Sequence, residues 1–236
     1  TVGAQLTGDD RVRGVMFTGS TEVATLLQRN IASRLDAQGR PIPLIAETGG
    51  MNAMIVDSSA LTEQVVVDVL ASAFDSAGQR CSALRVLCLQ DEIADHTLKM
   101  LRGAMAECRM GNPGRLTTDI GPVIDSEAKA NIERHIQTMR SKGRPVFQAV
   151  RENSEDAREW QSGTFVAPTL IELDDFAELQ KEVFGPVLHV VRYNRNQLPE
   201  LIEQINASGY GLTLGVHTRI DETIAQVTGS AHVGNL

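Results

Sequence analysis

Short apolar runs alternate with stretches of helical periodicity along the chain, and this alternation constrains the fold more than any other feature. Strand–helix alternation over 236 residues predicts an α/β domain with a largely parallel sheet. The expected strands are 15–18, 43–46, 53–56, 85–89, 165–171, 187–191, 212–216 and 233–236. The expected helices are 21–34, 61–77, 91–108, 126–142, 197–205 and 221–229.

Some of these segments carry more specific expectations. The run 15–18 reads as a short buried strand, and 85–89, which contains Cys88, as a strand buried on both faces. Ser20 or Thr21 is the expected N-cap of the helix that follows the first strand. The polar and charged stretch 149–161 reads as a surface excursion.

Charge and composition exclude several classes of function. A net charge of −8 without a basic cluster argues against nucleic acid or an anionic membrane as a direct partner. No run approaches the roughly 18 apolar residues of a membrane span, and no signal peptide opens the chain. Three cysteines suggest no disulfide framework, so a reducing cytoplasm is expected. The five histidines are scattered, and no metal site is expected.

One cysteine stands where a helical stretch gives way to a strand, in the run Phe74-Asp75-Ser76-Ala77-Gly78-Gln79-Arg80-Cys81. Gly78 allows the backbone to turn sharply before the thiol. Arg80 beside it would favour a thiolate. Cys81 is therefore the candidate nucleophile, whereas the other two cysteines read as inert structural residues.

A carboxylate precedes a double glycine in Glu47-Thr48-Gly49-Gly50, directly after the apolar run 43–46. Glycines at this place allow a ligand to approach the backbone closely. One thiol plus one carboxylate suggests covalent catalysis on a carbonyl group, in which the thiolate attacks and the carboxylate later handles a proton. A Cys–His hydrolase stays open, because the histidine partner of such a site is a spatial rather than a sequential neighbour.

The run Phe17-Thr18-Gly19-Ser20-Thr21 passes from strand to helix. The free N–H groups of a helix start suit a phosphate, although an ordinary capped turn fits the same residues equally well. The chain has neither GxGxxG nor GxxxxGK[ST], so no standard nucleotide fingerprint is present.

Taken together, these runs resemble the aldehyde dehydrogenase superfamily. Four of its signatures occur in its order along the chain: Phe17-Thr18-Gly19-Ser20, Glu47-Thr48-Gly49-Gly50, Gly78-Gln79-Arg80-Cys81 and Glu182-Val183-Phe184-Gly185-Pro186. The stretches 46–56 and 74–85 are similar to one branch, the Δ1-pyrroline-5-carboxylate (L-glutamate-γ-semialdehyde) dehydrogenase module of bacterial bifunctional proline utilisation proteins.

The resemblance implies an aldehyde dehydrogenase-like α/β catalytic domain with a mostly parallel sheet, preceded by the tail of a Rossmann-like cofactor domain. Residues 1–47 would be the truncated C-terminal part of the NAD-binding domain, and residues 48–236 the catalytic domain. The chain opens without an initiator Met and stops in a strand-like run, so we expect a piece of a longer protein that is inactive or weakly active alone.

The resemblance also implies roles for individual residues. Cys81 would attack the aldehyde to give a thiohemiacetal, hydride would pass to NAD, and Glu47 would activate the water that hydrolyses the thioester. The Cys81 backbone N–H would be one oxyanion donor. The other implied contacts are Gly19 and Ser20 with the pyrophosphate of NAD, Glu182 with the nicotinamide ribose, Phe184 with the nicotinamide side, and Ser82 with the substrate.

The expected setting follows from the same resemblance. The substrate would be a small aldehyde, and the parent chain would carry a flavin-dependent proline dehydrogenase module, so FAD belongs to that module alone. The parent is expected to be a homo-oligomer in the cytoplasm, associating peripherally with the inner membrane. The alternatives are an aldehyde dehydrogenase that acts on another substrate, the Cys-dependent hydrolase, and an inactive fragment of the parent enzyme. The sequence of this segment does not distinguish NAD from NADP as the cofactor.

Overall fold

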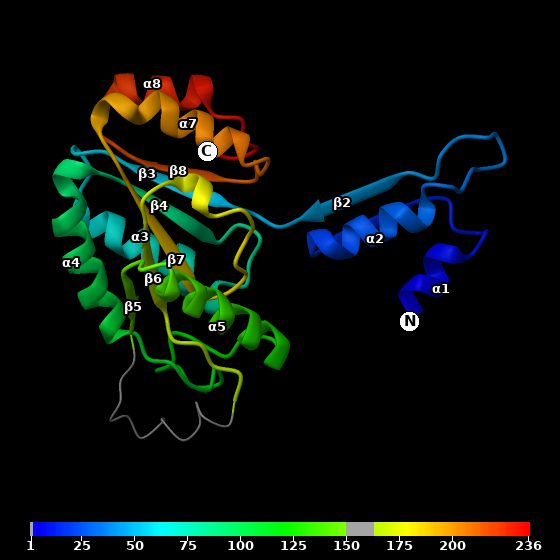
Figure 1. Cartoon of the computed structure of the whole chain (residues 1–236), viewed down its shortest axis with the longest axis horizontal. Coiled ribbons are helices and arrows are strands. Elements are labelled where there is room, and N and C mark those ends of the chain that lie inside the picture. Colours follow the sequence, from blue (N-terminus) through cyan, green and yellow to red (C-terminus); the bar gives the residue numbers. More distant parts are fainter. Residues whose placement is uncertain (1, 150–162) are drawn as a thin grey trace. The chain divides into compact units, whose positions relative to one another are not determined.

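The computed structural model describes residues 2–149 and 163–236, and it divides into two compact units, Thr1–Gly49 and Gly50–Leu236. Figure 1 draws the first unit in blue and the second from light blue through red. The surface excursion expected at 149–161 lies, apart from its first residue, outside the described residues. The identities of the two units as cofactor domain and catalytic domain stay predictions.

The first unit contains helix α1 (Val2–Gly8) and a two-stranded sheet with one helix against it. Strands β1 (Val15–Gly19) and β2 (Leu44–Thr48) pair in parallel, and α2 (Thr21–Ile31) connects them and contacts both. The expected N-cap is confirmed, because the Ser20 hydroxyl oxygen accepts from the Val23 N–H at 3.2 Å. The expectation that strand 15–18 is buried is wrong. Helix α2 contacts this small sheet, but Met16 on the strand is 83% exposed.

The second unit is built on a six-stranded sheet of order β5-β6-β7-β4-β3-β8. Its strands are β3 (Asn52–Val56), β4 (Leu84–Gln90), β5 (Val146–Gln148), β6 (Thr169–Leu173), β7 (Val187–Tyr193) and β8 (Leu214–His217). All neighbouring strands pair in parallel except β5 with β6. The predicted α/β fold with a mostly parallel sheet is therefore confirmed.

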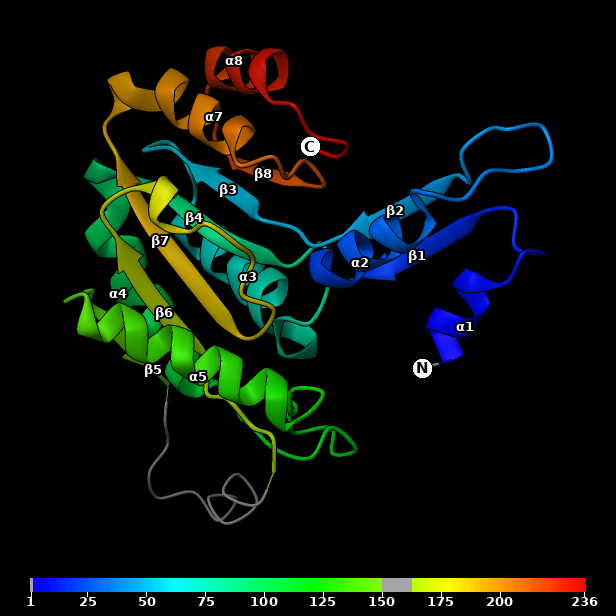
Figure 2. The ribbon, with the colours of Figure 1, turned by 45° about the vertical axis from the view of Figure 1, so that its right-hand side comes forward.

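Helices cover both faces of this sheet (Figures 1 and 2). The helices are α3 (Thr62–Phe74), α4 (Asp91–Glu107), α5 (Ser126–Ser141), α7 (Leu198–Ala207) and α8 (Asp221–Ser230), with short 3-10 turns η1 (Asp75–Gly78), η2 (Phe176–Glu178) and η3 (Arg195–Gln197). Helices α3 and α4 contact each other and both contact β4 and β7. Figure 2 shows α5 in front of the sheet and α3 and α4 behind it.

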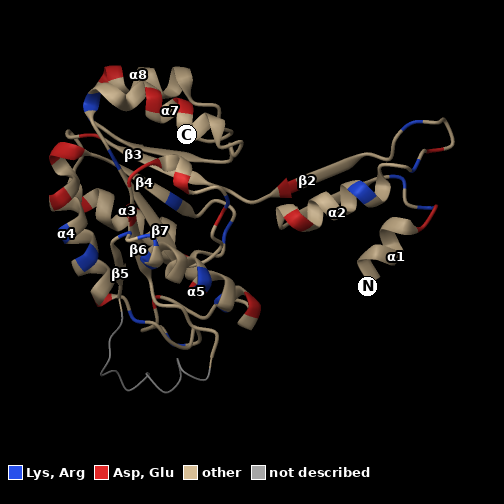
Figure 3. Cartoon of the chain, in the orientation of Figure 1, with Lys and Arg blue, Asp and Glu red and all other residues tan. Residues whose placement is uncertain are grey.

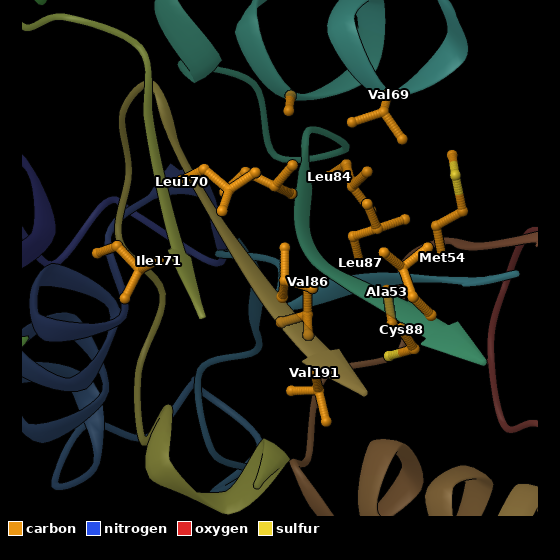
Figure 4. Close-up of a cluster of buried hydrophobic side chains, with 14 of the residues drawn as sticks. Ala53, Met54, Val69, Leu84, Val86, Leu87, Cys88, Leu170, Ile171 and Val191 are labelled. Atoms are coloured by element: carbon orange, nitrogen blue, oxygen red, sulfur yellow. The ribbon is translucent and has the colours of Figure 1, made fainter. Parts of the chain in front are cut away.

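The core of the second unit centres on β4, whose seven residues are all buried. This confirms the strand expected to be buried on both faces. In Figure 4, Cys88 lies among aliphatic side chains, and its partner in the register is Val191 of β7.

Several expected elements differ in the structure. The strand expected at 165–171 begins only at Thr169, and the helix expected over 21–34 ends at Ile31. The helix expected over 61–77 ends at Phe74, because Ser76 and Ala77 adopt positive φ angles of 56° and 52°. The strand expected at 233–236 is only a single bridge between Thr213 and Asn235. The antiparallel strand β5 has no counterpart in the expected pattern, since three residues are too few for a periodicity signal.

Basic and acidic side chains are interspersed over the described helices and loops (Figure 3). Among the described residues, no helix has both the length and the apolar character needed to cross a membrane. The described residues also contain no cluster of three or more histidine, cysteine or carboxylate side chains that could hold a metal ion.

Candidate active site

Cys81 lies in the short loop between η1 and β4, and its side chain is exposed. Three consecutive residues before this loop are left-handed, with φ angles of 56° at Ser76, 52° at Ala77 and 65° at Gly78. Such a conformation costs a non-glycine residue about 1–2 kcal/mol, so the surrounding contacts must hold it. The backbone therefore leaves α3 abruptly, and the thiol comes after the helix instead of on it.

Gln79 ties this turn to a distant loop. Its side-chain nitrogen Nε2 donates to the carbonyls of Ser76, at 3.2 Å, and Pro122, at 3.3 Å. Its oxygen Oε1 accepts from the Ile124 N–H at 2.8 Å. The amide thus satisfies one carbonyl of the left-handed turn and two backbone groups of the loop at 122–124, none of which lies in an α-helix or a strand ladder.

Asn52 at the start of β3 holds the backbone of the nucleophile loop from the other side. Its Nδ2 donates to the carbonyl oxygens of Cys81, at 2.7 Å, and Ala83, at 2.9 Å, while its Oδ1 accepts from the Thr213 N–H at 3.1 Å. The side chain is buried, and each of these bonds offsets the cost of removing the amide from water. Sequence analysis missed this residue, although a polar amide at the head of an apolar strand was a signal.

Gly50 packs directly against the same loop. A Cβ atom there would lie 2.2 Å from the Cys81 carbonyl oxygen, so no larger residue fits without a shift. We expected the double glycine to allow close approach of a ligand. In the structure the close neighbour of Gly50 is the backbone of the nucleophile loop itself.

Arg85 is the second residue that sequence analysis missed. Its side chain is fully buried, yet it reaches both the nucleophile loop and the turn that contains Glu182 and Phe184. Its Nε and Nη2 donate to Oε1 of Glu182 at 3.1 and 2.9 Å. The guanidinium carbon lies 5.2 Å from the centre of the Phe184 ring. Burial lowers the pKa of Arg85, and the charge of Glu182 acts in the opposite direction. A buried arginine inside an apolar run of residues was the signal that pointed to it.

Arg80 is engaged by the preceding helix. Its Nη2 donates to the carbonyl oxygen of Ala71 in α3 at 2.9 Å. The expectation that Arg80 favours a thiolate at Cys81 stays a prediction.

Ser82 lines a cavity of about 580 Å³ in the second unit. The Nε2 atom of His217 and the Oδ2 atom of Asp68, both also in its lining, lie 3.2 Å apart. Cys81 is not among the lining residues, although its neighbours Arg80 and Ser82 are. The expected contact of Ser82 with the substrate stays a prediction.

The remaining expected residues lie in the first unit, at the carboxyl ends of β1 and β2. In the parallel register Thr18 stands opposite Glu47, and Gly19 and Ser20 follow at the start of α2. The carboxyl ends of parallel strands meet at one edge of a sheet, where ligands of α/β proteins bind. The structure thus brings Gly19, Ser20 and the exposed Glu47 to one edge of the first unit.

Each unit, taken by itself, carries groups that suit one part of a dinucleotide. The start of α2 offers backbone N–H groups to a phosphate. In the second unit, both bonds from Arg85 go to Oε1 of Glu182, and the second oxygen of that carboxylate is an acceptor of the kind that a ribose hydroxyl needs. These side chains therefore fit NAD by their chemistry.

Comparison with known protein families matches residues 1–236 to the Aldehyde dehydrogenase family. The Bifunctional protein PutA of Salmonella typhimurium (strain LT2) is 94% identical over the whole chain, which corresponds to 18% of that protein. The 1-pyrroline-5-carboxylate dehydrogenase of Geobacillus kaustophilus is 31% identical over 237 aligned residues and 44% of its own length. The chain therefore spans only part of each of these relatives.

Solved structures agree with the sequence relatives. A crystal structure of bifunctional proline utilization A superposes with a TM-score of 0.89 and 46% identity, covering 99% of this chain and 23% of that one. A betaine aldehyde dehydrogenase variant from Staphylococcus aureus, in complex with NAD+ and with a modified cysteine, gives a TM-score of 0.88 at 29% identity, covering 99% of this chain and 46% of that one. With the ordered motifs, the parallel sheet and the match from the first residue to the last, the chain belongs to the aldehyde dehydrogenase family.

Proposed function

We propose that the longer protein to which this chain corresponds oxidises L-glutamate γ-semialdehyde, formed from Δ1-pyrroline-5-carboxylate, to L-glutamate with NAD, in the catabolism of proline. The observation that carries the proposal is the exposed Cys81 thiol on a loop held by Gln79, Asn52 and Arg85. The names of the relatives, PutA and 1-pyrroline-5-carboxylate dehydrogenase, support the substrate.

The chemistry begins at Cys81. Its thiolate adds to the aldehyde carbon, forming a C–S bond and a thiohemiacetal whose oxygen carries the displaced electron pair. The Cys81 backbone N–H donates to that oxyanion. When bound, NAD supplies the hydride acceptor that leaves a thioester on the cysteine. Glu47 takes a proton from the water that attacks the thioester, and cleavage of the C–S bond releases the carboxylic acid and the thiol.

The proposed cofactor contacts use residues of both units. Gly19 and Ser20 bind the pyrophosphate at the start of α2, which the N-cap geometry supports. Glu182 binds the nicotinamide ribose, and Phe184, 45% exposed, lies against the nicotinamide side. Ser82 contacts the substrate.

The remaining proposals concern the longer parent protein: its second module, its oligomeric state and its location. We propose a proline dehydrogenase module with FAD in the same parent chain, which the word "bifunctional" in the relatives' names supports. The parent is proposed to be a homo-oligomer in the cytoplasm. This segment makes no direct contact with nucleic acid or membrane, in keeping with its net charge of −8.

The test is steady-state and rapid-mixing measurement of NADH formation by the full-length protein with a panel of aldehydes. Cys81→Ala should abolish oxidation and leave NAD binding within about twofold, because the thiol forms the covalent bond but does not hold the cofactor. Glu47→Gln should give a burst of NADH followed by a slow steady rate, because it removes the base that acts after hydride transfer.

Three results would contradict the proposal. Near-normal turnover of Cys81→Ala would exclude the nucleophile. Loss of the burst in Glu47→Gln in proportion to the steady rate would place Glu47 earlier in the reaction. Ester hydrolysis by the full-length protein without any need for NAD would favour the Cys-dependent hydrolase.

A further inference from the structure

We infer that Arg85 is a positioning residue that aligns the oxyanion donor of the nucleophile loop with the carboxylate that takes the cofactor ribose. This inference rests on the proposed function and assigns a role to a side chain outside the signature motifs. Arg85 lies at the start of β4 and is the largest fully buried side chain of the described residues.

Arg85 holds the peptide bond between Arg80 and Cys81. Nη2 of Arg85 donates to the carbonyl oxygen of Arg80 at 3.1 Å. A peptide bond is planar and trans, so its N–H points away from its C=O. The Ala83 N–H donates to the same oxygen at 3.1 Å, so Arg85 and this backbone bond together hold the Arg80 oxygen and thereby set the direction of the Cys81 N–H, which is the proposed oxyanion donor.

Arg85 also holds the turn 182–186. Nε and Nη2 of Arg85 both donate to Oε1 of Glu182, while Nη1 donates to the carbonyl oxygen of Gly185 at 3.2 Å. Two points of the turn are thus held by one guanidinium. Because both bonds to the carboxylate use Oε1, its Oε2 keeps its lone pairs for a ribose hydroxyl.

The two segments also touch each other independently of Arg85. A Cβ at Gly78 would lie 2.2 Å from the Gly185 oxygen, so the turn before Cys81 packs against the turn after Glu182. The position of one segment therefore constrains the other. Arg85 bonds to both segments: the loop that carries the nucleophile Cys81, and the turn that carries the proposed cofactor contacts Glu182 and Phe184.

Only an arginine suits this role. The planar guanidinium carries five N–H donors in a rigid fork, whereas a lysine ammonium is a point charge on a flexible stem. Arg85 uses its fork on three acceptor groups, and its own carbonyl oxygen faces Nδ1 of His189 at 3.2 Å, so its backbone is held as well. A buried arginine that only stabilised the fold would need a charged partner such as Glu182. It would not also need an acceptor in the nucleophile loop, which Arg85 has in the Arg80 carbonyl.

The test compares Arg85→Met and Arg85→Lys with the wild type and with Arg102→Met, all in the full-length protein. Arg102 is a matched control, because its Nη2 pairs with Oε1 of Glu172 at 2.5 Å in the same unit, between α4 and β6. For Arg85→Met we expect KM for NAD to rise about tenfold or more and kcat to fall about tenfold to a hundredfold. KM for the aldehyde should change less than about threefold, and Arg102→Met should match the wild type.

A second readout does not depend on turnover. NAD should change the rate at which iodoacetamide alkylates Cys81, and the NAD concentration that gives half of this change should rise about tenfold in Arg85→Met. If the wild type neither oxidises aldehydes with NAD nor shows an effect of NAD on alkylation, the proposed function fails. If the wild type shows both and Arg85→Met behaves like Arg102→Met, the role of Arg85 is overturned.

Arg85→Lys decides the case in which Arg85→Met does not fold. It keeps the charge and loses the fork, so we expect a folded protein with an intermediate KM for NAD. Wild-type kinetic constants in Arg85→Lys would overturn the inference, because a point charge would then suffice. Failure of Arg85→Lys to fold would assign Arg85 to the stability of the fold and would overturn it as well.

Discussion

Two cysteines of the same segment differ in their access to solvent. Cys81 is exposed in its loop, whereas Cys88 is buried in the central strand β4. Burial raises the pKa of Cys88 to about 12, since a thiolate there would have no water around it. Thiol chemistry at neutral pH requires both solvent access and thiolate character. Of these two cysteines, only Cys81 has the access.

We therefore expect iodoacetamide to modify Cys81 well before Cys88 in the folded full-length protein. The measurement is peptide mapping by mass spectrometry over a time course, with urea-unfolded protein as the control in which both thiols react. Cys108, half-buried beyond the end of α4, should react at an intermediate rate. Labelling of Cys88 ahead of Cys81 would contradict both the burial of β4 and the choice of nucleophile.

Gly78 and Gly143 have similar left-handed backbone angles, but only Gly78 is closely packed. Comparing them distinguishes the effect of backbone strain from the effect of close packing. Gly78 has φ +65° and its added Cβ would meet the Gly185 oxygen at 2.2 Å. Gly143 has φ +79°, and an added Cβ would meet nothing within 4 Å. Alanine at either position bears the strain of a left-handed conformation, but only at Gly78 must two functional segments move apart.

Gly78→Ala should lower the free energy of unfolding by more than about 2 kcal/mol and reduce aldehyde oxidation more than about tenfold. Gly143→Ala should cost about 1 kcal/mol and leave activity within about twofold. Urea unfolding of this chain and NADH formation by the full-length protein check the two effects. Equal losses of activity in both variants would show that the contact between Gly78 and Gly185 has no functional weight.

At the scale of elements, α5 and β7 are joined by a pair of histidines in the interior. Nε2 of His135 and Nε2 of His189 lie 2.9 Å apart, with the rings edge to face. Nδ1 of His189 faces the Arg85 carbonyl, which can only accept, so this nitrogen carries the proton and Nε2 accepts from His135. Burial, with a smaller contribution from the neighbouring His135, lowers the pKa of His189 to about 3.

The sign of the pH effect follows from these pKa values. An unfolded histidine titrates near 6.5, so below that pH the unfolded chain binds a proton that folded His189 does not. The stability of the folded state is therefore complete above about pH 6.5 and falls as the pH drops toward 3. At pH 5 the loss from this one group is about 2 kcal/mol.

We expect His189→Gln to remove about 2 kcal/mol of the wild-type difference in unfolding free energy between pH 7 and pH 5. Glutamine keeps a donor for the Arg85 carbonyl and does not titrate. Urea unfolding of this chain at the two pH values measures the effect. His96→Gln, at an exposed position of α4, is the control and should keep the wild-type difference. An unchanged difference in His189→Gln would show that His189 is protonated in the folded protein.

At the scale of the whole molecule, the buried hydrophobic cluster belongs to one unit. It begins at Met51 and ends at Val227, and none of the described residues of the first unit contributes to it. The first unit buries only a few side chains of its own, among them Ala24, Ile31 and Ile42. A piece of about 50 residues buries a small share of its surface and is marginal by itself.

Residues 50–236 expressed alone should therefore fold cooperatively and keep slow amide hydrogen exchange in β4 and β7. Residues 1–49 alone should show no cooperative transition, and they serve as the matched control. Circular dichroism during thermal unfolding and exchange measured by mass spectrometry would decide. Fast exchange throughout β4 in the longer fragment would show that the first unit is needed to fold the second.

The sequence by itself determined the fold class, most of the strands and helices in their order along the chain, and the family. Periodicity is local, so 85–89 was recognisable as a doubly buried strand and Ser20 as an N-cap without any neighbour in space. The ordered motifs likewise named Cys81 and Glu47 from the linear chain alone, although their roles stay predictions.

Only the tertiary structure decided how the nucleophile loop is held. The left-handed turn at Ser76 and Ala77 breaks a helical pattern that continues in the sequence, because contacts from Gln79 and Gly185 outweigh local propensity. Asn52 and Arg85 meet their acceptors across 29 and 97 residues of chain, at Cys81 and Glu182. Hydrogen bonds between such distant residues leave no period in the sequence, so they emerge only when the strands are assembled into a sheet.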